Sequence, residues 1–485
     1  MNNGMDYDVV VIGGGPAGVT AALRSRELGA SVALVERGVL GGVCTNDGCA
    51  PTRVLARAAR LVRDTEQFED YGLVGEPPVV DFARLMANTR RMIEKLHDKK
   101  QLLHHLQEAG VRVWTQAGEA HFMDEHTIVL ENGEKLRAKL VILCNGGHAR
   151  RISFPGSEYA LTHSDVWSMD HLPESIVILG GAATGCQLAS VFTAYGSKVT
   201  ILEAGPQLLG REDSLIAETI TASFKQRGIE IVTGISGADH IEKTSNGLEM
   251  VYRKGDGLHA VTAEAAIIAV GWPGNIENLD LARANVQTER GYIIVNDYLQ
   301  TSVPHIFAAG DITGRMMLVQ SAGYEARVAA ENAILGLGQP GTHLIVPHGG
   351  FTDPEYGSVG ITEEQAKKSG VDYLAATVSF GELDRAVIDN HQEGFCKILI
   401  SEETHRILGA HVIGEQALEI VHLVAASMAA DMWIEQLAEL EIAYPTYTAI
   451  VGLAARQLVR ELGVIPLSPE WGALGKPLAE WERKD

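Results

Sequence analysis

Two of the five cysteines, Cys44 and Cys49, are separated by only four residues, and both could do redox chemistry as thiols. Residues 52–63 have the pattern of a helix, and Pro51 suits its first position because proline has no N–H to leave unpaired. Cys49 is therefore expected at a helix N-terminus, where free amides and the helix dipole favour a thiolate. Arg53 adds a cation in that first turn, which requires an anionic neighbour such as a thiolate or an electron-rich cofactor. Two buried structural cysteines are the alternative, and the pair alone does not decide between the two interpretations.

A glycine-rich loop near the start of the chain has the spacing of a dinucleotide-binding site. Gly13 would make the tight turn, Gly15 would let the backbone approach a pyrophosphate, and Gly18 would let the next helix pack on its strand. Amides at that helix N-terminus would hold phosphate, and Glu36 would accept a hydrogen bond from a ribose hydroxyl. The required flanking elements are all predicted: a buried strand at 7–12, a helix closing at Gly29 and a strand at 31–35.

The same plan recurs between residues 175 and 203, so the chain contains an internal repeat. A strand precedes Gly180, a helix follows Gly185, and a second strand ends at Glu203. Ala182 replaces the middle glycine, and its methyl group would crowd a pyrophosphate there. Because Glu203 would accept from a free 2′-hydroxyl and repel a 2′-phosphate, this second site is predicted to prefer NAD(H) to NADP(H).

Further glycines follow later apolar strands, at the strand ends where a dinucleotide would bind. Asp311 closes one of these strands; it could be a simple turn residue, but beside a dinucleotide it could bind ribityl or phosphate groups. The additional residues expected to contact a cofactor are Gly42, Gly146, Gly271, Gly310 and Asp311.

The pattern changes from about residue 340, where a run of strands precedes a run of helices. That order indicates an α+β domain. The sequence therefore predicts an α/β fold class with two tandem Rossmann-like dinucleotide-binding domains and a C-terminal α+β domain. The tail at 463–485 is interrupted by proline and glycine and is expected to lie along the surface.

Composition narrows the function classes. A formal charge of −22 over 485 residues argues against nucleic acid and anionic membranes as partners. We expect no signal peptide before the first strand, and no apolar run approaches the ~18–20 residues needed to span a bilayer. Five scattered cysteines do not form a secreted disulfide framework, which favours a reducing cytoplasm. His104, His105 and His422 lack metal-ligand spacing, so no metal site is predicted.

With these motifs in this order, the chain resembles the class I pyridine nucleotide–disulfide oxidoreductases. That flavoprotein family includes dihydrolipoamide dehydrogenase, glutathione reductase, mercuric reductase and the soluble transhydrogenase. The resemblance runs from Tyr7 to about Leu462. Its landmarks are Gly13–Gly18, Gly-Gly-Val-Cys44 to Cys49-Ala-Pro51, Ala-Ala-Gly310-Asp311, Phe351-Thr-Asp353-Pro354-Glu355 and Tyr444-Pro445-Thr446.

The resemblance implies a homodimer with an active site shared across the interface and a small-molecule substrate. FAD would bind the first fold, NAD(P)H would bind the second and pass a hydride to the flavin, and the flavin would reduce a Cys44–Cys49 disulfide. Cys49 would be the flavin-side thiol and Cys44 the thiol that attacks substrate. The implied domains are an FAD-binding domain built from residues 1–154 and residues 281–345, an NAD(H)-binding domain at 155–280, and an interface domain with its tail at 346–485.

The chain also departs from the family pattern. Tyr444 and Ala449 stand where dithiol-exchanging members have a histidine and its orienting glutamate, and tyrosine, with a pKa of about 10, is a poor base near neutral pH. Arg53 and Gln187 replace a lysine–glutamate pair near the flavin, which should raise the flavin potential. Ala183 and Trp272 replace a bulky gate residue and an arginine. These departures include the remaining candidate catalytic residues, Arg53, Gln187 and Tyr444.

Three functions therefore remain open. The favoured one is an NADH-dependent FAD disulfide reductase acting on a small disulfide or related electrophile. The second is a nucleotide transhydrogenase, quinone reductase or metal-ion reductase that does not need the cysteine pair. The third is a flavin-bound protein with decayed catalysis, which Ala182, Tyr444 and Ala449 would support.

Overall fold

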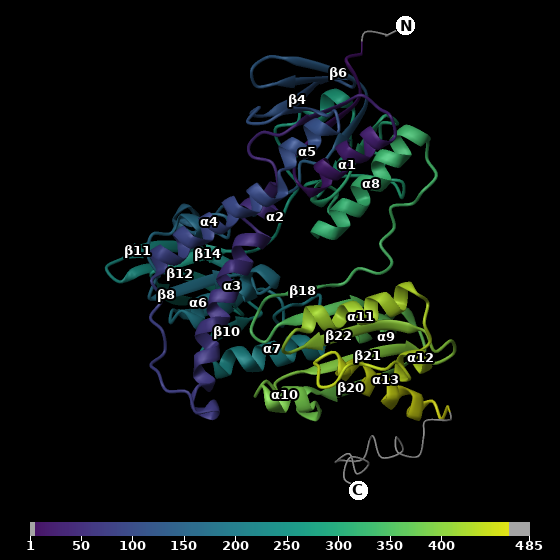
Figure 1. Cartoon of the computed structure of the whole chain (residues 1–485). Coiled ribbons are helices and arrows are strands. Elements are labelled where there is room, and N and C mark those ends of the chain that lie inside the picture. The colour runs from purple at the N-terminus through teal and green to yellow at the C-terminus, as the bar shows by residue number, and fades with distance from the viewer. Residues whose placement is uncertain (1–4, 465–485) are drawn as a thin grey trace.

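A computed structural model of the chain describes residues 5–464, and its elements fall into three groups (Figure 1). The first dinucleotide fold lies at the top of the view, the second at the left and the C-terminal domain at the lower right. Most of the 463–485 tail, whose surface course the sequence predicts, lies outside the described residues. The three groups confirm the predicted fold class.

The first sheet has seven strands, in the order β3-β2-β1-β6-β5-β4 with β17 also paired to β6. Its centre is β1 (Tyr7–Ile12), the predicted β-branched run, which is parallel to both neighbours. Helices α1 (Pro16–Glu27) and α8 (Val319–Leu335) pack on one face, because their small side chains interlock with the strand residues. The other strands are β2 (Val32–Val35), β3 (Arg112–Trp114), β4 (Ala120–Asp124), β5 (Thr127–Leu130), β6 (Lys135–Leu143) and β17 (Ile306–Ala308).

The second fold repeats this plan as a parallel sheet in the order β10-β9-β8-β14-β7. A three-stranded antiparallel sheet, absent from the sequence-based prediction, packs against it. The elements are β7 (Leu161–Thr162), β8 (Ser175–Leu179), α6 (Ala183–Ala194), β9 (Lys198–Glu203), α7 (Ser214–Gln226), β10 (Glu230–Thr233), β11 (Gly237–Thr244), β12 (Gly247–Lys254), β13 (Gly257–Ala263) and β14 (Ala265–Ile268). The hairpin of β15 (Thr288–Glu289) and β16 (Tyr292–Ile293) follows.

The C-terminal domain is an antiparallel sheet, β18-β19-β22-β21-β20, whose core is shared with its helices. As predicted, its strands precede the helices at its C-terminal end. The elements are β18 (His348–Gly350), β19 (Tyr356–Gly360), α9 (Glu363–Ser369), β20 (Tyr373–Ser379), α10 (Asp384–Ile388), β21 (Phe395–Ser401), β22 (Ile407–Ile413), α11 (Ala417–Ala429), α12 (Ile434–Ala438) and α13 (Ala449–Glu461).

Four helices between β2 and β3 carry and support the cysteine pair. They are α2 (Gly42–Asn46), α3 (Cys49–Asp64), α4 (Phe82–Lys100) and α5 (Leu102–Glu108). Helix α3 starts at Cys49, so Pro51 is its third residue rather than its first, still within the turn whose amides are unpaired. The sequence of residues 82–108 predicts a helix, and in the structure this helix is broken at Gln101, whose φ is 43°. None of the helices within residues 5–464 is long and apolar enough to cross a membrane.

Candidate active site

The outer glycines of both loops are required by the chain itself. Gly13 has a φ of 103°, and a Cβ there would lie 2.3 Å from the carbonyl oxygen of Cys144. A Cβ on Gly18 would lie 1.7 Å from the carbonyl oxygen of Gly13, so the helix could not approach its strand. Gly180 (φ 112°) and Gly185 face the same obstacles, at 2.4 Å and 1.9 Å. The two loops therefore have one geometry.

The middle position of each loop is different, because the chain leaves room there. A Cβ on Gly15 would meet only the Cα of Gly42, at an ordinary 3.6 Å. Ala182 occupies the equivalent place with φ −81° and ψ −174°, close to the −76° and −172° of Gly15. A Cβ on Gly146 would meet nothing within 4 Å. The packing of the chain itself therefore does not require glycine at position 15.

Each loop is held by the acid that ends the next strand. Glu36 accepts hydrogen bonds from the backbone amides of Gly14 (2.6 Å) and Gly38 (2.8 Å). Glu203 accepts from Gly181 and Gly205, both at 2.5 Å. Both carboxylates therefore lie beside the glycine loops, where a ribose hydroxyl would be recognised.

A single cavity of about 1830 Å³ connects the two loops, the cysteines and the C-terminal domain. A single-ligand pocket is typically ~300–1,000 Å³, so this cavity has room for two dinucleotides. Four predicted residues, Gly18, Arg53, Gly185 and Tyr444, do not line it. The predicted residues that do are Gly13, Gly15, Glu36, Gly42, Cys44, Cys49, Gly146, Gly180, Gln187, Glu203, Gly271, Gly310 and Asp311.

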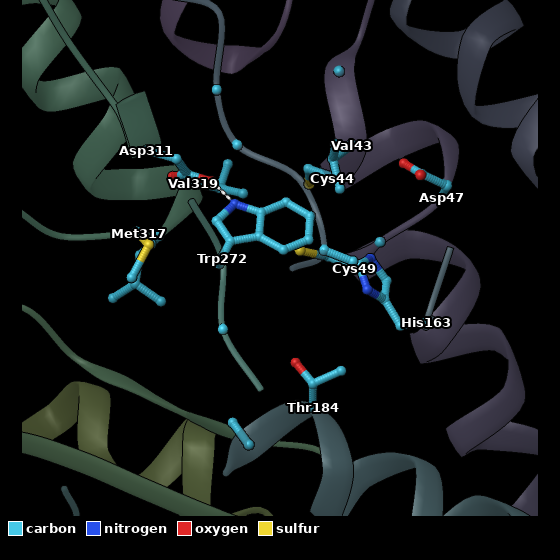
Figure 2. A pocket seen from close by; sticks show the side chains of 18 of the residues that line it. Val43, Cys44, Asp47, Cys49, His163, Thr184, Trp272, Asp311, Met317 and Val319 are labelled. Atoms are coloured by element: carbon cyan, nitrogen blue, oxygen red, sulfur yellow. Dashed lines mark hydrogen bonds between the residues drawn. The ribbon is translucent and has the colours of Figure 1, made fainter. Parts of the chain in front are cut away.

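Cys44 and Cys49 come from successive helices and both lie on the cavity wall (Figure 2). The Cys49 thiol donates to Cys44, which lowers the pKa of Cys44 to about 7 and raises the pKa of Cys49 above its ordinary value. Lys100 also favours the Cys44 thiolate, whereas Asp311 opposes it. In the dithiol form this arrangement places the first negative charge on Cys44, although Cys49 begins the helix.

Asp311 is held in the middle of the cavity by an indole. Trp272 Nε1 donates to Asp311 Oδ2 at 2.9 Å, and burial raises the pKa of this carboxyl while the indole bond opposes the rise. Gly310, with a φ of 82°, donates its amide to the fully buried Glu325 at 2.7 Å. The turn that presents Asp311 is therefore fixed from both sides.

Arg53 and Gln187 meet at Phe351 rather than at each other. The Arg53 guanidinium lies 4.2 Å from the centre of the Phe351 ring, and Gln187 Oε1 accepts from the Phe351 amide at 3.1 Å. Burial raises the pKa of Glu355, and the nearby charge of Arg53 opposes that rise. Arg53 thus has an acidic neighbour that the sequence-based analysis did not assign.

Tyr444 lies in the C-terminal domain, outside the cavity of its own chain. Its side chain is 75% exposed, and its hydroxyl donates to Asp384. The chain alone does not bring Tyr444 to the cysteines.

The cavity residues that were not predicted from the sequence include His163, Glu212 and His348. Although burial opposes it, contact with Glu212 raises the pKa of His348. His163 reaches the sulfur end from the linker between β7 and β8 of the second fold (Figure 2). Residues 44 and 163 are too far apart in the sequence to form a recognisable motif. Only the three-dimensional structure shows that His163 lies near the cysteines.

The residues present fit two dinucleotides. Both helix N-termini, α1 and α6, face the cavity with their glycine loops, as phosphate binding requires. The Oδ1 of Asn145, at the end of β6, is buried and has no hydrogen-bond partner within residues 5–464. It would be satisfied by a donor on a bound ligand. The same residues contain no cluster of three or more histidine, cysteine or acidic side chains arranged to hold a metal.

Comparisons with known proteins agree with this geometry. Residues 7–326 match the family model described as pyridine nucleotide-disulphide oxidoreductase, and residues 346–455 match the dimerisation domain of that family. A dihydrolipoyl dehydrogenase from Geobacillus stearothermophilus is 32% identical, over 93% of this chain and 96% of the relative. A mercuric reductase from Staphylococcus aureus is 29% identical, over 94% of this chain and 83% of its own.

The fold also matches a solved structure closely. The HOCl-induced flavoprotein disulfide reductase RclA from Escherichia coli superposes with a TM-score of 0.82 at 27% identity, over 93% of this chain and 99% of its own. A Cu(II) complex of RclA matches equally well.

Proposed function

Because the chain belongs to the class I pyridine nucleotide-disulphide oxidoreductase family, we propose that it is an NADH-dependent disulfide reductase that works through Cys44 and Cys49. The family uses FAD and NAD(P)H, and this chain is an enzyme of that kind. FAD, when bound, would supply the two-electron chemistry that links a nicotinamide hydride to the cysteine disulfide. The observation that carries the proposal is the hydrogen-bonded cysteine pair on the wall of a cavity that both glycine loops share.

The exchange itself needs only the two sulfurs. The Cys44 thiolate attacks one sulfur of a substrate disulfide, which forms a mixed disulfide and releases one product thiolate. Cys49 then attacks Cys44 Sγ, which releases the second thiolate and forms the Cys44–Cys49 disulfide. One NADH and one proton restore the dithiol, so each turnover converts a disulfide to two thiols.

Each of the two glycine loops would hold one of the two cofactors. Gly13, Gly15, Glu36 and Asp311 would hold FAD, and the second loop would hold the hydride donor. Glu203 favours NADH, because its carboxylate would repel a 2′-phosphate. The ratio of kcat/KM for NADH and NADPH measures this preference, and Glu203→Gln should reduce it. A wild-type ratio that favours NADPH would overturn this aspect of the proposal.

We also propose that the protein is a homodimer in the cytoplasm. The dimerisation domain supports a homodimer, and we place a second copy across the site, so that Tyr444 of one protomer approaches the cavity of the other. All five cysteines are free thiols in the structure, which fits a reducing cytoplasm.

The test is a panel of small disulfides with NADH and purified holoenzyme. Wild-type protein should oxidise one NADH per disulfide, whereas Cys44→Ser should fall to background. Cys396→Ser is the matched control, because Cys396 is buried in the C-terminal sheet and should leave turnover unchanged. Full disulfide turnover by Cys44→Ser would show that the pair is not needed.

Cu(II) reduction is a second candidate, since RclA forms a Cu(II) complex and shares this fold. One NADH would reduce two Cu(II) ions. NADH-dependent Cu(I) production with no turnover on any disulfide would favour this candidate over the first.

A further inference from the structure

We propose that His163 is the same-chain proton acceptor and donor of the Cys44–Cys49 pair, which rests on the proposed disulfide reductase function. Thiol–disulfide exchange removes a proton from the attacking thiol and returns one to the leaving thiolate. A group that holds this proton between the two events must lie in the same cavity as the sulfurs. Tyr444 does not meet this condition within its own chain, because it lies outside the cavity.

The first support is position. His163 lines the cavity that Cys44 and Cys49 line, and Figure 2 shows its ring pointing inward at the sulfur end. Three histidines line this cavity within the described residues. The other two approach from the C-terminal domain, where His348 contacts Glu212 at 3.4 Å and His422 bonds to a carbonyl of its own helix, α11.

The second support is that the imidazole is held relative to the cysteines. Trp167, four residues further along the linker, donates its indole N–H to the carbonyl oxygen of Asp47, in the loop between the two cysteines. The His163 ring also packs 5.1 Å from the Trp272 ring, whose indole is fixed on Asp311. The linker, the cysteine loop and the Asp311 turn therefore form one braced unit.

The hydrogen bonds leave the ring able to exchange protons. Asp165 is already engaged: its Oδ2 accepts from Thr162 at 2.7 and 2.8 Å and pairs with Arg151 at 2.6 Å. His163 Nε2 contacts only the hydroxyl of Ser164, at 3.2 Å, among the described groups. A hydroxyl can donate to the neutral ring and accept from the charged one, so both forms are tolerated.

The burial of His163 favours a neutral resting imidazole. Burial lowers the pKa of His163, while Asp47 and Asp165 act in the opposite direction. The pKa of the Cys44 thiol is lowered to about 7, so this thiol can give up a proton near neutral pH. Lys100 and Asp311 face the sulfurs with opposite charges.

The proton path follows. The Cys44 thiol gives its proton to His163 as its sulfur attacks the substrate disulfide. The imidazolium then gives the same proton to the departing product thiolate, while the Cys49 proton leaves with the second product. The reductant is a nicotinamide hydride donor, and no proton remains unaccounted for.

The test compares two acceptors in the holoenzyme, a small disulfide and ferricyanide, which takes electrons from NADH without thiol exchange. His163→Gln should lower kcat/KM for the disulfide about 100-fold, the lower end of general acid–base effects. Ferricyanide turnover should stay within twofold. His104→Gln, at an exposed position on α5 outside the cavity, is the control and should leave both reactions unchanged.

Chemical rescue distinguishes a proton-transfer role of His163 from a purely structural one. Free imidazole should restore some of the disulfide turnover of His163→Ala, with a pH profile that follows imidazole. Equal loss with both acceptors, no loss with the disulfide, or no rescue would overturn the assignment. If Cys44→Ser still reduces disulfides, the reductase proposal itself fails, whatever His163 does.

Discussion

At the scale of single residues, the two sulfurs are not equivalent. Cys49 opens helix α3, yet its thiol donates to Cys44, so the thiolate forms first on Cys44. This direction suits the proposed chemistry, because the sulfur that ionises first is the one that attacks substrate. The helix N-terminus then stabilises Cys49 only when its turn comes to lose a proton.

This asymmetry predicts a pH effect. In NADH-reduced holoenzyme, alkylation of Cys44 by iodoacetamide should rise with pH around a midpoint near 7. Cys49→Ala removes the hydrogen bond that lowers the pKa of Cys44, so the midpoint should move up towards the ordinary 9.0. Mass spectrometry of the modified peptide against pH gives both curves. An unchanged midpoint would mean that Lys100, rather than Cys49, sets the acidity of Cys44.

The glycine loops were predictable residue by residue, because backbone geometry alone demands Gly13 and Gly18. His163 was not, since its role depends on a linker folding back over a loop more than a hundred residues earlier. Glu355 was missed beside Arg53 for the same reason. Side chains that meet through tertiary packing leave no spacing in the sequence.

At the scale of elements, α3 couples the cysteines to the C-terminal domain. Its start lies on the cavity, its middle packs on α6, and Arg60 near its end pairs with Asp353 at 3.0 Å and with Glu415. Tyr195, at the end of α6, donates to the carbonyl of Leu55 at 2.7 Å. Helix α3, which carries Cys49, therefore contacts helix α6, which follows the second glycine loop.

Arg60→Met should loosen this docking. It leaves two partly buried carboxylates without their shared cation, and we expect a loss of about 2 kcal/mol, below the 3–5 kcal/mol of a fully buried pair. Arg57→Met, at an exposed position on the same helix, is the control and should change stability by less than ~0.5 kcal/mol. Urea unfolding of both variants measures the difference, and equal midpoints would contradict the docking role.

Glu363, in the first turn of helix α9, is expected to make the stability of the fold depend on pH in the acid range. Hydrogen bonds from Lys367, then Lys397 and Tyr373, lower the pKa of Glu363 to about 2. A carboxylate with a depressed folded pKa stabilises the native state above its unfolded value of about 4.3, and loses that contribution as pH falls towards 2. Glu363→Gln should therefore flatten the decline of thermal midpoint between pH 5 and pH 2. An identical slope in variant and wild type would contradict it.

Hydrophobic periodicity in the sequence predicted the helices and strands, but it did not predict where a helix is interrupted. The sequence predicts one helix over 82–108, whereas Gln101 at φ 43° divides it into α4 and α5. Nothing in a glutamine signals a left-handed residue, because tertiary packing imposes it. The β11–β13 sheet was missed because its strands are largely exposed and lack a strong apolar run.

At the scale of the whole molecule, one cavity is walled by three domains, and the C-terminal one carries apolar surface. Val387 and Ile388 on α10 are 51% and 58% exposed, and Tyr444 is 75% exposed. Such residues fit the face that a second copy would cover. The expected assembly is the homodimer that the dimerisation domain indicates.

Light scattering should give twice the chain mass of 52.1 kDa. If the site is shared, dilution below the dimer dissociation constant should abolish disulfide turnover before ferricyanide turnover, since only the former needs both protomers. A monomer with full disulfide turnover would refute the shared site.

The hydrogen bond from Trp167 to Asp47 joins two parts of the chain that lie far apart in the sequence. Trp167 lies in the segment between β7 and β8 of the second nucleotide fold, and Asp47 lies in the loop between the two cysteines. Because this bond holds the turn that separates Cys44 from Cys49, the placement of the second fold and the placement of the cysteine pair are set together.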